Sequence, residues 1–176
     1  SDIAKSVEEV DKPDRVGEVV ARAAEVETKV RRAVGQLRHG MPVTPAAATG
    51  SGALGAGAIG VCCAKLGEAE ILASQGIDSI LITTPVVGES KIGRLLAANN
   101  RADIKVVVDN EDNINMLASM AQLAGTMVDV LIEVDIGQGR CGVPPGPEAA
   151  RLALIISEHH CLKFAGLQGY QGKIQM

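Results

Sequence analysis

The sequence has almost no aromatic residues. None of its 176 residues is Trp, and Phe164 and Tyr170 are its one Phe and one Tyr. A core without aromatic rings must be filled with Val, Ile, Leu and Ala, which is typical of parallel β-sheets. The shortage of rings also removes the stacking platforms that proteins binding single-stranded nucleic acids use. The composition therefore favours an α/β protein and argues against a nucleic-acid-binding one.

An excess of positive charge is also missing. The chain has 17 Lys and Arg against 21 Asp and Glu, a net charge of −4, so we expect no basic surface for a phosphate backbone. Residues 1–9 lack the apolar run of a signal peptide. The longest uncharged stretch, residues 39–64, is too rich in Gly, Ala and Pro for a membrane span. We therefore expect neither nucleic acid nor a membrane as a partner.

The four cysteines do not form a disulfide framework. Cys62 and Cys63 are adjacent, Cys141 and Cys161 lie far from them, and the sequence contains no C-x-x-C. Cysteines used in this way are typical of a reducing compartment. The sequence therefore predicts a cytoplasmic protein.

From residue 58 onward, short apolar runs alternate with segments of helical periodicity. The apolar runs, at 58–63, 79–82, 104–108, 128–134 and 164–168, predict strands, and the segments 68–75, 90–98, 112–124 and 147–159 predict helices. Gly76 and Gly125 lie where helix C-caps are expected. Strands joined by crossover helices predict a parallel sheet. Because a complete βα barrel needs about 250 residues, we expect either an open doubly wound sheet or the first part of a barrel.

The first 57 residues differ from the rest of the chain. Apolar residues at close to helical spacing predict an amphipathic helix over 14–37. The tract 41–60 then has no charge, six Ala and five Gly, and fits neither a strand nor a helix. We therefore divide the chain into an atypical N-terminal segment, 1–57, and a partial βα barrel, 58–176.

Two segments match the glycine motif G-x-G-x-x-G, at 50–55 and 137–142. The first has no predicted strand before it. The second follows the apolar strand that ends near Asp135, but 143–147 reads V-P-P-G-P and separates it from the next helix. A dinucleotide site needs the motif to run directly into a helix. Residues 137–142 are therefore predicted to form a functional loop, with a Rossmann-like nucleotide site as an alternative.

Polar residues follow the predicted strands, where parallel α/β folds keep their chemistry. These residues are Lys65, Thr83, Thr84, Asp109, Asn110, Glu133, Asp135, Arg140, Gln168 and Tyr170. Asn110 or Asp112 suits the N-cap of the next helix. Lys65 is either a solvated lysine at a helix start or a desolvated amine able to form a Schiff base. The neighbouring His159, His160 and Cys161 would point in different directions on a helix, so we expect no metal site there.

Three blocks, at 60–70, 134–143 and 164–172, resemble those of the D-threonine aldolases. The D-3-hydroxyaspartate aldolases and dehydratases and the D-serine dehydratases share similar blocks. The resemblance implies an alanine-racemase-like (fold type III) enzyme, in which a βα barrel holds pyridoxal phosphate, a second β domain follows and a homodimer completes the site. It further implies a divalent metal, Mn or Mg, and cleavage of D-threonine or a related D-β-hydroxy-α-amino acid to glycine and an aldehyde.

The resemblance also assigns residues. Arg140 is expected near the ring oxygen of the cofactor or the substrate, and Gln168, Tyr170 and Thr84 are expected to line the cofactor pocket. The family places its lysine in a block reading roughly R-P-H-x-K-x-H-K, whereas residues 37–44 read L-R-H-G-M-P-V-T. Lys65 is therefore the candidate for the catalytic lysine, and the metal ligands are expected outside this sequence. Two other functions stay open: a D-3-hydroxyaspartate or D-serine dehydratase, and a catalytically inactive half-barrel.

Overall fold

The computed structural model describes residues 52–55 and 57–172. Its elements, in chain order, are β1 (Val61–Cys63), α4 (Leu66–Ser74), β2 (Ser79–Ile82), α5 (Glu89–Asn99), β3 (Asp103–Val108), α6 (Glu111–Ala124), β4 (Val128–Val134), α7 (Pro147–Glu158) and β5 (Leu162–Gly169). Three predicted features lie wholly or partly outside the described residues: the helix over 14–37, most of the tract 41–60 and the start of the first glycine motif. Within that tract the described residues 52–55 are helical, where the sequence predicted neither a strand nor a helix. Among the described helices, none is long and apolar enough to cross a bilayer.

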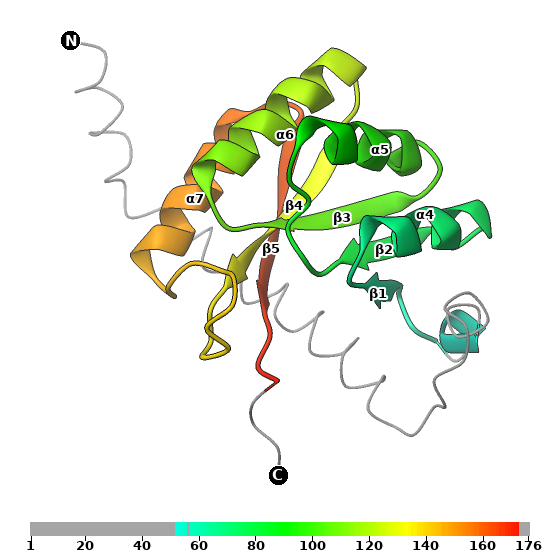
Figure 1. Ribbon diagram of the computed structural model, residues 1–176, viewed down its shortest axis with the longest axis horizontal. Helices are drawn as coiled ribbons and strands as arrows, with labels where there is room; N and C mark the ends of the chain where they lie inside the picture. The colour runs from blue at the N-terminus through cyan, green and yellow to red at the C-terminus, as the bar shows by residue number, and fades with distance from the viewer. Residues whose placement is uncertain (1–51, 56, 173–176) are drawn as a thin grey trace.

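The strands lie side by side in the order in which the chain makes them. The sheet order is β1-β2-β3-β4-β5, and each neighbouring pair is parallel. Since βαβ crossovers are right-handed, strands added always on the same side place every connecting helix on the same face. Figure 1 shows α4 to α7 together on one face of the sheet. A doubly wound sheet reverses its strand order and carries helices on both faces. The described chain is therefore part of a parallel βα barrel.

The hydrophobic core lies between the sheet and this single layer of helices. Fully buried side chains from the sheet include Ile80, Ile82, Ile104, Val106 and Ile132, and those from the helices include Ile92, Leu95, Ile114, Leu152 and Ile156. Each such side chain contributes about 1.5–3 kcal/mol when it leaves water. Aliphatic residues fill this layer, as the shortage of aromatic rings predicts, and Phe164 packs only against its margin.

One irregularity in the sheet decides which side chains meet near its end. The register between β4 and β5 shifts after Val130, so that Ala165 is an extra residue on β5. A bulge of this kind moves every later residue by one position and so exchanges the two faces of the strand. As a result Gln168, and not Leu167, lies opposite Glu133.

Helix α6 begins at a side-chain cap that gives a first test of the fold. Asn110 is its N-cap and its side chain accepts a hydrogen bond from the backbone N–H of Asn113 at 2.9 Å. Asn110→Ala should lower the free energy of unfolding by about 1 kcal/mol, because that N–H loses its acceptor. Asn110→Asp, which keeps an acceptor, should retain most of the stability. Urea unfolding of both variants measures the difference, and equal losses would contradict the cap.

Candidate functional site

The residues singled out at the strand ends lie along the carboxyl-terminal edge of the sheet. Hydrogen bonds join them across long stretches of sequence. The Gln168 side chain at the end of β5 reaches the carbonyl oxygen of Thr83, 85 residues earlier, at 3.2 Å. It also reaches Glu133, 35 residues earlier. The candidate site is therefore built from β2, β4 and β5 together.

Lys65 and Thr84 lie at the ends of β1 and β2. Lys65 is the N-cap residue of α4, and its side chain is exposed. The backbone N–H groups of Ala64 and Lys65 both donate to the Glu68 carboxylate at 3.0 Å. The Thr84 hydroxyl donates to the carbonyl oxygen of Ala64. Thr84 therefore fixes the backbone directly before Lys65, and the lysine side chain is left in the solvent.

Backbone hydrogen bonds join the two ends of the loop 135–143. The Asp135 N–H donates to the Val143 carbonyl, and the Val143 N–H donates to the Glu133 carbonyl, both at 2.9 Å. The Asp135 carboxylate accepts from the N–H groups of Gly137 and Gly139, at 2.9 and 3.0 Å. The glycine amides of this motif therefore bind a carboxylate of the same chain. That arrangement fits a positioned loop and not a phosphate-binding turn.

Asp109 has a function that helix capping does not explain. Asn110 caps α6 as expected, but the Asp109 carboxylate accepts a hydrogen bond from the Gly142 N–H at 3.1 Å. The two residues are 33 positions apart in the sequence. Of the two N-cap candidates, Asn110 and Asp112, Asn110 is the cap, and capping leaves Asp109 unexplained. Asp109 holds the far end of the loop against β3.

Arg140 and Tyr170 meet at the rim of the site. The guanidinium of Arg140 lies 5.6 Å from the centroid of the Tyr170 ring, a distance at which a cation and an aromatic face attract each other. Both residues are exposed. The pKa of Arg140 is raised, first by a hydrogen bond with Cys141 and then by the nearby Glu133 and Tyr170. The loop therefore presents a permanently charged donor to solvent.

Two hydrogen bonds join the chain after β5 to the same loop. The Gln171 side chain donates to the Ile136 carbonyl at 3.3 Å, and the Gly172 N–H donates to the Gln138 side chain at 3.0 Å. Tyr170 lies immediately before these contacts. The loop and the Tyr170 segment therefore form one structural unit, which explains how residues so far apart in sequence come together.

Glu133 and Gln168 form a buried polar pair beneath the loop. Their exposed fractions are 2% and 8%, and Gln168 Nε2 donates to Glu133 Oε2 at 2.7 Å. Burial raises the pKa of Glu133 to about 7, and the carboxylates of Asp109 and Asp135 add to that rise. Arg140 and the Gln168 hydrogen bond act in the opposite direction. Sequence reasoning placed Glu133 at a strand end without a role; the signal was a carboxylate that follows the apolar run 130–132 in the same strand.

The His159–Cys161 segment ties two helices together. His159 Nε2 lies 3.1 Å from Asn115 Oδ1, and the Cys161 thiol donates to the Ala118 carbonyl at 3.2 Å. Both contacts link the end of α7 to α6. Within residues 52–55 and 57–172, no group of three or more His, Cys, Asp or Glu side chains is arranged to hold a metal ion.

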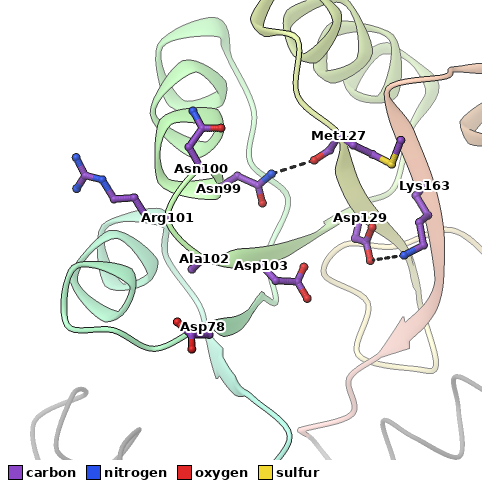
Figure 2. A pocket seen from close by; sticks show the side chains of 9 residues that line it. All are labelled: Asp78, Asn99, Asn100, Arg101, Ala102, Asp103, Met127, Asp129 and Lys163. Atoms are coloured by element: carbon purple, nitrogen blue, oxygen red, sulfur yellow. Dashed lines mark hydrogen bonds and ion pairs between the residues drawn. The ribbon is translucent and has the colours of Figure 1, made fainter.

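A separate hollow of about 470 Å³ lies at the opposite, amino-terminal edge of the sheet (Figure 2). It is lined by Asp78, Asn99, Asn100, Arg101, Ala102, Asp103, Met127, Asp129 and Lys163. Two contacts join its lining residues: Lys163 forms an ion pair with Asp129 at 3.2 Å, and the Asn99 side chain donates to the Met127 carbonyl at 2.9 Å. Because this edge of a βα barrel serves stability, these contacts hold the strand starts together.

Comparison with known proteins gives consistent matches. Residues 18–175 match the family described as "Alanine racemase, N-terminal domain". The chain is 41% identical over 122 residues to a D-threonine aldolase from Arthrobacter sp, covering 69% of this chain and 32% of that protein. It is 39% identical over 120 residues to a 3-hydroxy-D-aspartate aldolase from Paracoccus denitrificans (strain Pd 1222), covering 68% and 31%.

The same similarity appears in a solved structure. The crystal structure of D-threonine aldolase from Filomicrobium marinum superposes with a TM-score of 0.70 at 35% identity, covering 88% of this chain and 42% of that one. The chain therefore spans about a third of the length of the curated relatives that it matches.

Proposed function

Because the chain belongs to the family of the alanine racemase N-terminal domain, we propose that it is the cofactor-binding part of a pyridoxal-phosphate-dependent lyase. Its substrate would be D-threonine or a related D-β-hydroxy-α-amino acid, which it would split into glycine and an aldehyde. The observation that carries this proposal is the unit formed by the 135–143 loop and the Tyr170 segment, which presents Arg140 over the Tyr170 ring.

The residues at the strand ends suit a planar, anionic cofactor. Arg140 is a charged donor with a planar fork, which matches phenolate, carboxylate or phosphate oxygens. Tyr170 offers a ring surface at the rim. Gln168 has a buried amide oxygen that has no hydrogen-bond partner in the structure, a sign that a donor is still to be supplied. Lys65 supplies an exposed primary amine at the same edge.

When bound, the pyridine ring of the cofactor would take up the electron pair left on Cα as the Cα–Cβ bond breaks. In this proposal Arg140 and Gln168 bind and orient the ring, and Thr84 holds the backbone that carries Lys65. The β-hydroxyl must lose a proton as the aldehyde leaves. Among residues 52–55 and 57–172, this proposal assigns that role to none. A homodimer stays part of the proposal because alanine-racemase-like enzymes complete their site across one.

Reductive trapping tests the cofactor and the lysine together. The 176-residue chain would be incubated with pyridoxal phosphate, reduced with borohydride and analysed by peptide mass spectrometry. We expect one stoichiometric adduct, on Lys65, that is lost in Lys65→Arg and kept in Lys91→Arg, a control lysine on the exposed surface of α5. An adduct on another lysine would reassign the catalytic amine, and no stoichiometric adduct would overturn the cofactor proposal for this chain.

The reaction itself needs a separate assay. D-threonine should yield glycine and acetaldehyde in equal amounts, whereas L-threonine should yield neither. Formation of an α-keto acid and ammonia instead would identify a dehydratase. Failure of both reactions, with the lysine adduct present, would leave a cofactor-binding half-barrel without lyase activity.

A further inference from the structure

The buried pair beneath the loop leaves one hydrogen-bonding position unfilled. Gln168 Nε2 donates to two acceptors, Glu133 Oε2 at 2.7 Å and the Thr83 carbonyl at 3.2 Å. The amide oxygen on the other side of the same group, Gln168 Oε1, is buried and accepts nothing. A buried acceptor without a donor is costly and uncommon. A second state of the pair that supplies a donor would therefore be favoured if one were accessible.

The backbone of the loop 135–143 packs against the Glu133 side chain. A Cβ placed on Gly142 would lie 3.1 Å from Glu133 Cγ and 2.7 Å from the Asp135 nitrogen, so the loop passes directly over the carboxyl group. The charged groups around Glu133 are Asp109 from the end of β3, and Asp135 and Arg140 from the loop; Gln168 faces it from β5. Two of these groups are carboxylates and one is a cation. Burial is the first cause that disfavours a charged Glu133 and raises its pKa to about 7; Arg140 opposes that rise, and Asp109 and Asp135 add to it.

The charge on Glu133 and that on Arg140 act on each other. A charged Glu133 is an internal counter-ion for Arg140, and a neutral Glu133 leaves more of the Arg140 positive charge for an external anion. By linkage, an anion that binds beside Arg140 must then favour the protonated form of Glu133 to the same extent. The binding of an anion and the binding of a proton are therefore coupled.

We propose that Glu133 is a positioning residue that binds its proton more tightly when an anionic ligand binds beside Arg140, and that Gln168 then turns its amide so that Oε1 accepts the O–H. The proton comes from solvent and stays on the Glu133 carboxyl, and no covalent bond other than that O–H forms. The turn would give the unfilled amide oxygen its donor, in exchange for the hydrogen bonds that Nε2 now donates to Glu133 and, at 3.2 Å, to the Thr83 carbonyl. The identification of the ligand as pyridoxal phosphate rests on the proposed function. The protonation of Glu133 does not depend on that function.

The protonation state is measured first, on the chain without cofactor. The infrared band of a neutral carboxyl group should be present at pH 6, fade as the pH rises through about 7 and be absent in Glu133→Gln. Glu89→Gln, which removes an exposed carboxyl group in the first turn of α5, should leave the band unchanged. A wild-type chain without a neutral carboxyl band at pH 6 overturns the proposal, whatever the cofactor does.

The coupling is measured next, with pyridoxal phosphate as the anion. If the ligand raises the pKa of Glu133 by one unit from about 7, wild-type affinity should fall about 5-fold relative to that of Glu133→Gln between pH 6 and pH 8. The ratio is the readout, since it cancels the titration of the cofactor itself. Calorimetry in two buffers should show uptake of protons near pH 7 for the wild type and less for Glu133→Gln. A constant ratio overturns the coupling. If neither protein binds the cofactor at any pH, the proposed function has failed, and the infrared titration still decides the state of Glu133.

Discussion

Gly142→Ala is expected to lower the free energy of unfolding by about 3 kcal/mol, from backbone strain together with overpacking. Gly142 has a φ of +103°, a conformation that residues with a side chain rarely adopt. Its missing Cβ would lie 2.7 Å from the Asp135 nitrogen and 2.9 Å from the Val134 carbonyl carbon. Because both atoms belong to the backbone at the end of β4, no side-chain rotation can relieve the contact.

Gly146 provides a matched control a few residues further on. Its φ is +102°, nearly the same as that of Gly142, but a Cβ placed there meets nothing within 4 Å. Gly146→Ala should therefore lose only the backbone part, about 2 kcal/mol. Urea unfolding of the two variants separates strain from crowding. Equal losses would mean that the loop does not lie against the end of β4.

The same pair of variants connects the loop to the candidate site. The loop displaced by Gly142→Ala carries Arg140 with it and breaks the Asp109–Gly142 hydrogen bond. We therefore expect Gly142→Ala to weaken binding of pyridoxal phosphate by at least about 10-fold, whereas Gly146→Ala should bind it as the wild type does. Binding is measured without denaturant, at a temperature well below the unfolding transition of the weaker variant.

Local sequence signals were sufficient for the secondary structure. The strands predicted at 79–82 and 128–134 have those bounds in the structure, and the other elements predicted from residue 58 onward end within a few residues of the observed ones. The largest difference is at the first strand, expected from residue 58 and observed from Val61. Gly60, just before it, lies so close to Ser79 that a Cβ would be 2.6 Å from the Ser79 hydroxyl. This short distance between Gly60 and Ser79 depends on the neighbouring strand, and the local pattern of apolar residues does not indicate it.

The architecture could not be settled from the same signals. A helix that covers one face of a sheet has the same amphipathic pattern whichever face it covers, so periodicity does not separate a barrel from a doubly wound sheet. The strand order decides between them, and strand order is a non-local property. The three sequence blocks did carry that information indirectly, since they pointed to a family whose members form barrels.

The positions of the candidate residues at the strand ends could be predicted from the sequence, but their contacts could not. Strand ends could be located from the sequence, and so Arg140, Gln168 and Tyr170 could be named. The pairing of Gln168 with Glu133 could not be predicted. It depends on the bulge opposite Val130 and Leu131, which shifts the rest of β5 by one residue. Without that bulge Leu167 would face the carboxylate, so no rule based on alternation along β5 places Gln168 there.

Arg140→Ala is expected to weaken binding of pyridoxal phosphate by about 10- to 100-fold, the contribution of a charge-assisted hydrogen bond to an anion. The fold should keep its stability to within about 0.5 kcal/mol, because the side chain is exposed. Arg140→Lys keeps the charge but loses the planar fork, so its affinity should lie between those of the wild type and Arg140→Ala. Absorbance titration with the cofactor measures all three.

Arg101 is the control that ties this effect to one edge of the sheet. It is also an exposed arginine, but it lines the hollow at the amino-terminal edge, on the far side from the candidate site (Figure 2). Arg101→Ala removes the same charge from the protein as Arg140→Ala, so a general loss of attraction for anions would weaken binding equally in both. We expect Arg101→Ala to bind like the wild type. Equal weakening would assign the effect to net charge and remove Arg140 from the cofactor site, whereas a loss confined to Arg140→Ala would place the cofactor beside the Tyr170 ring.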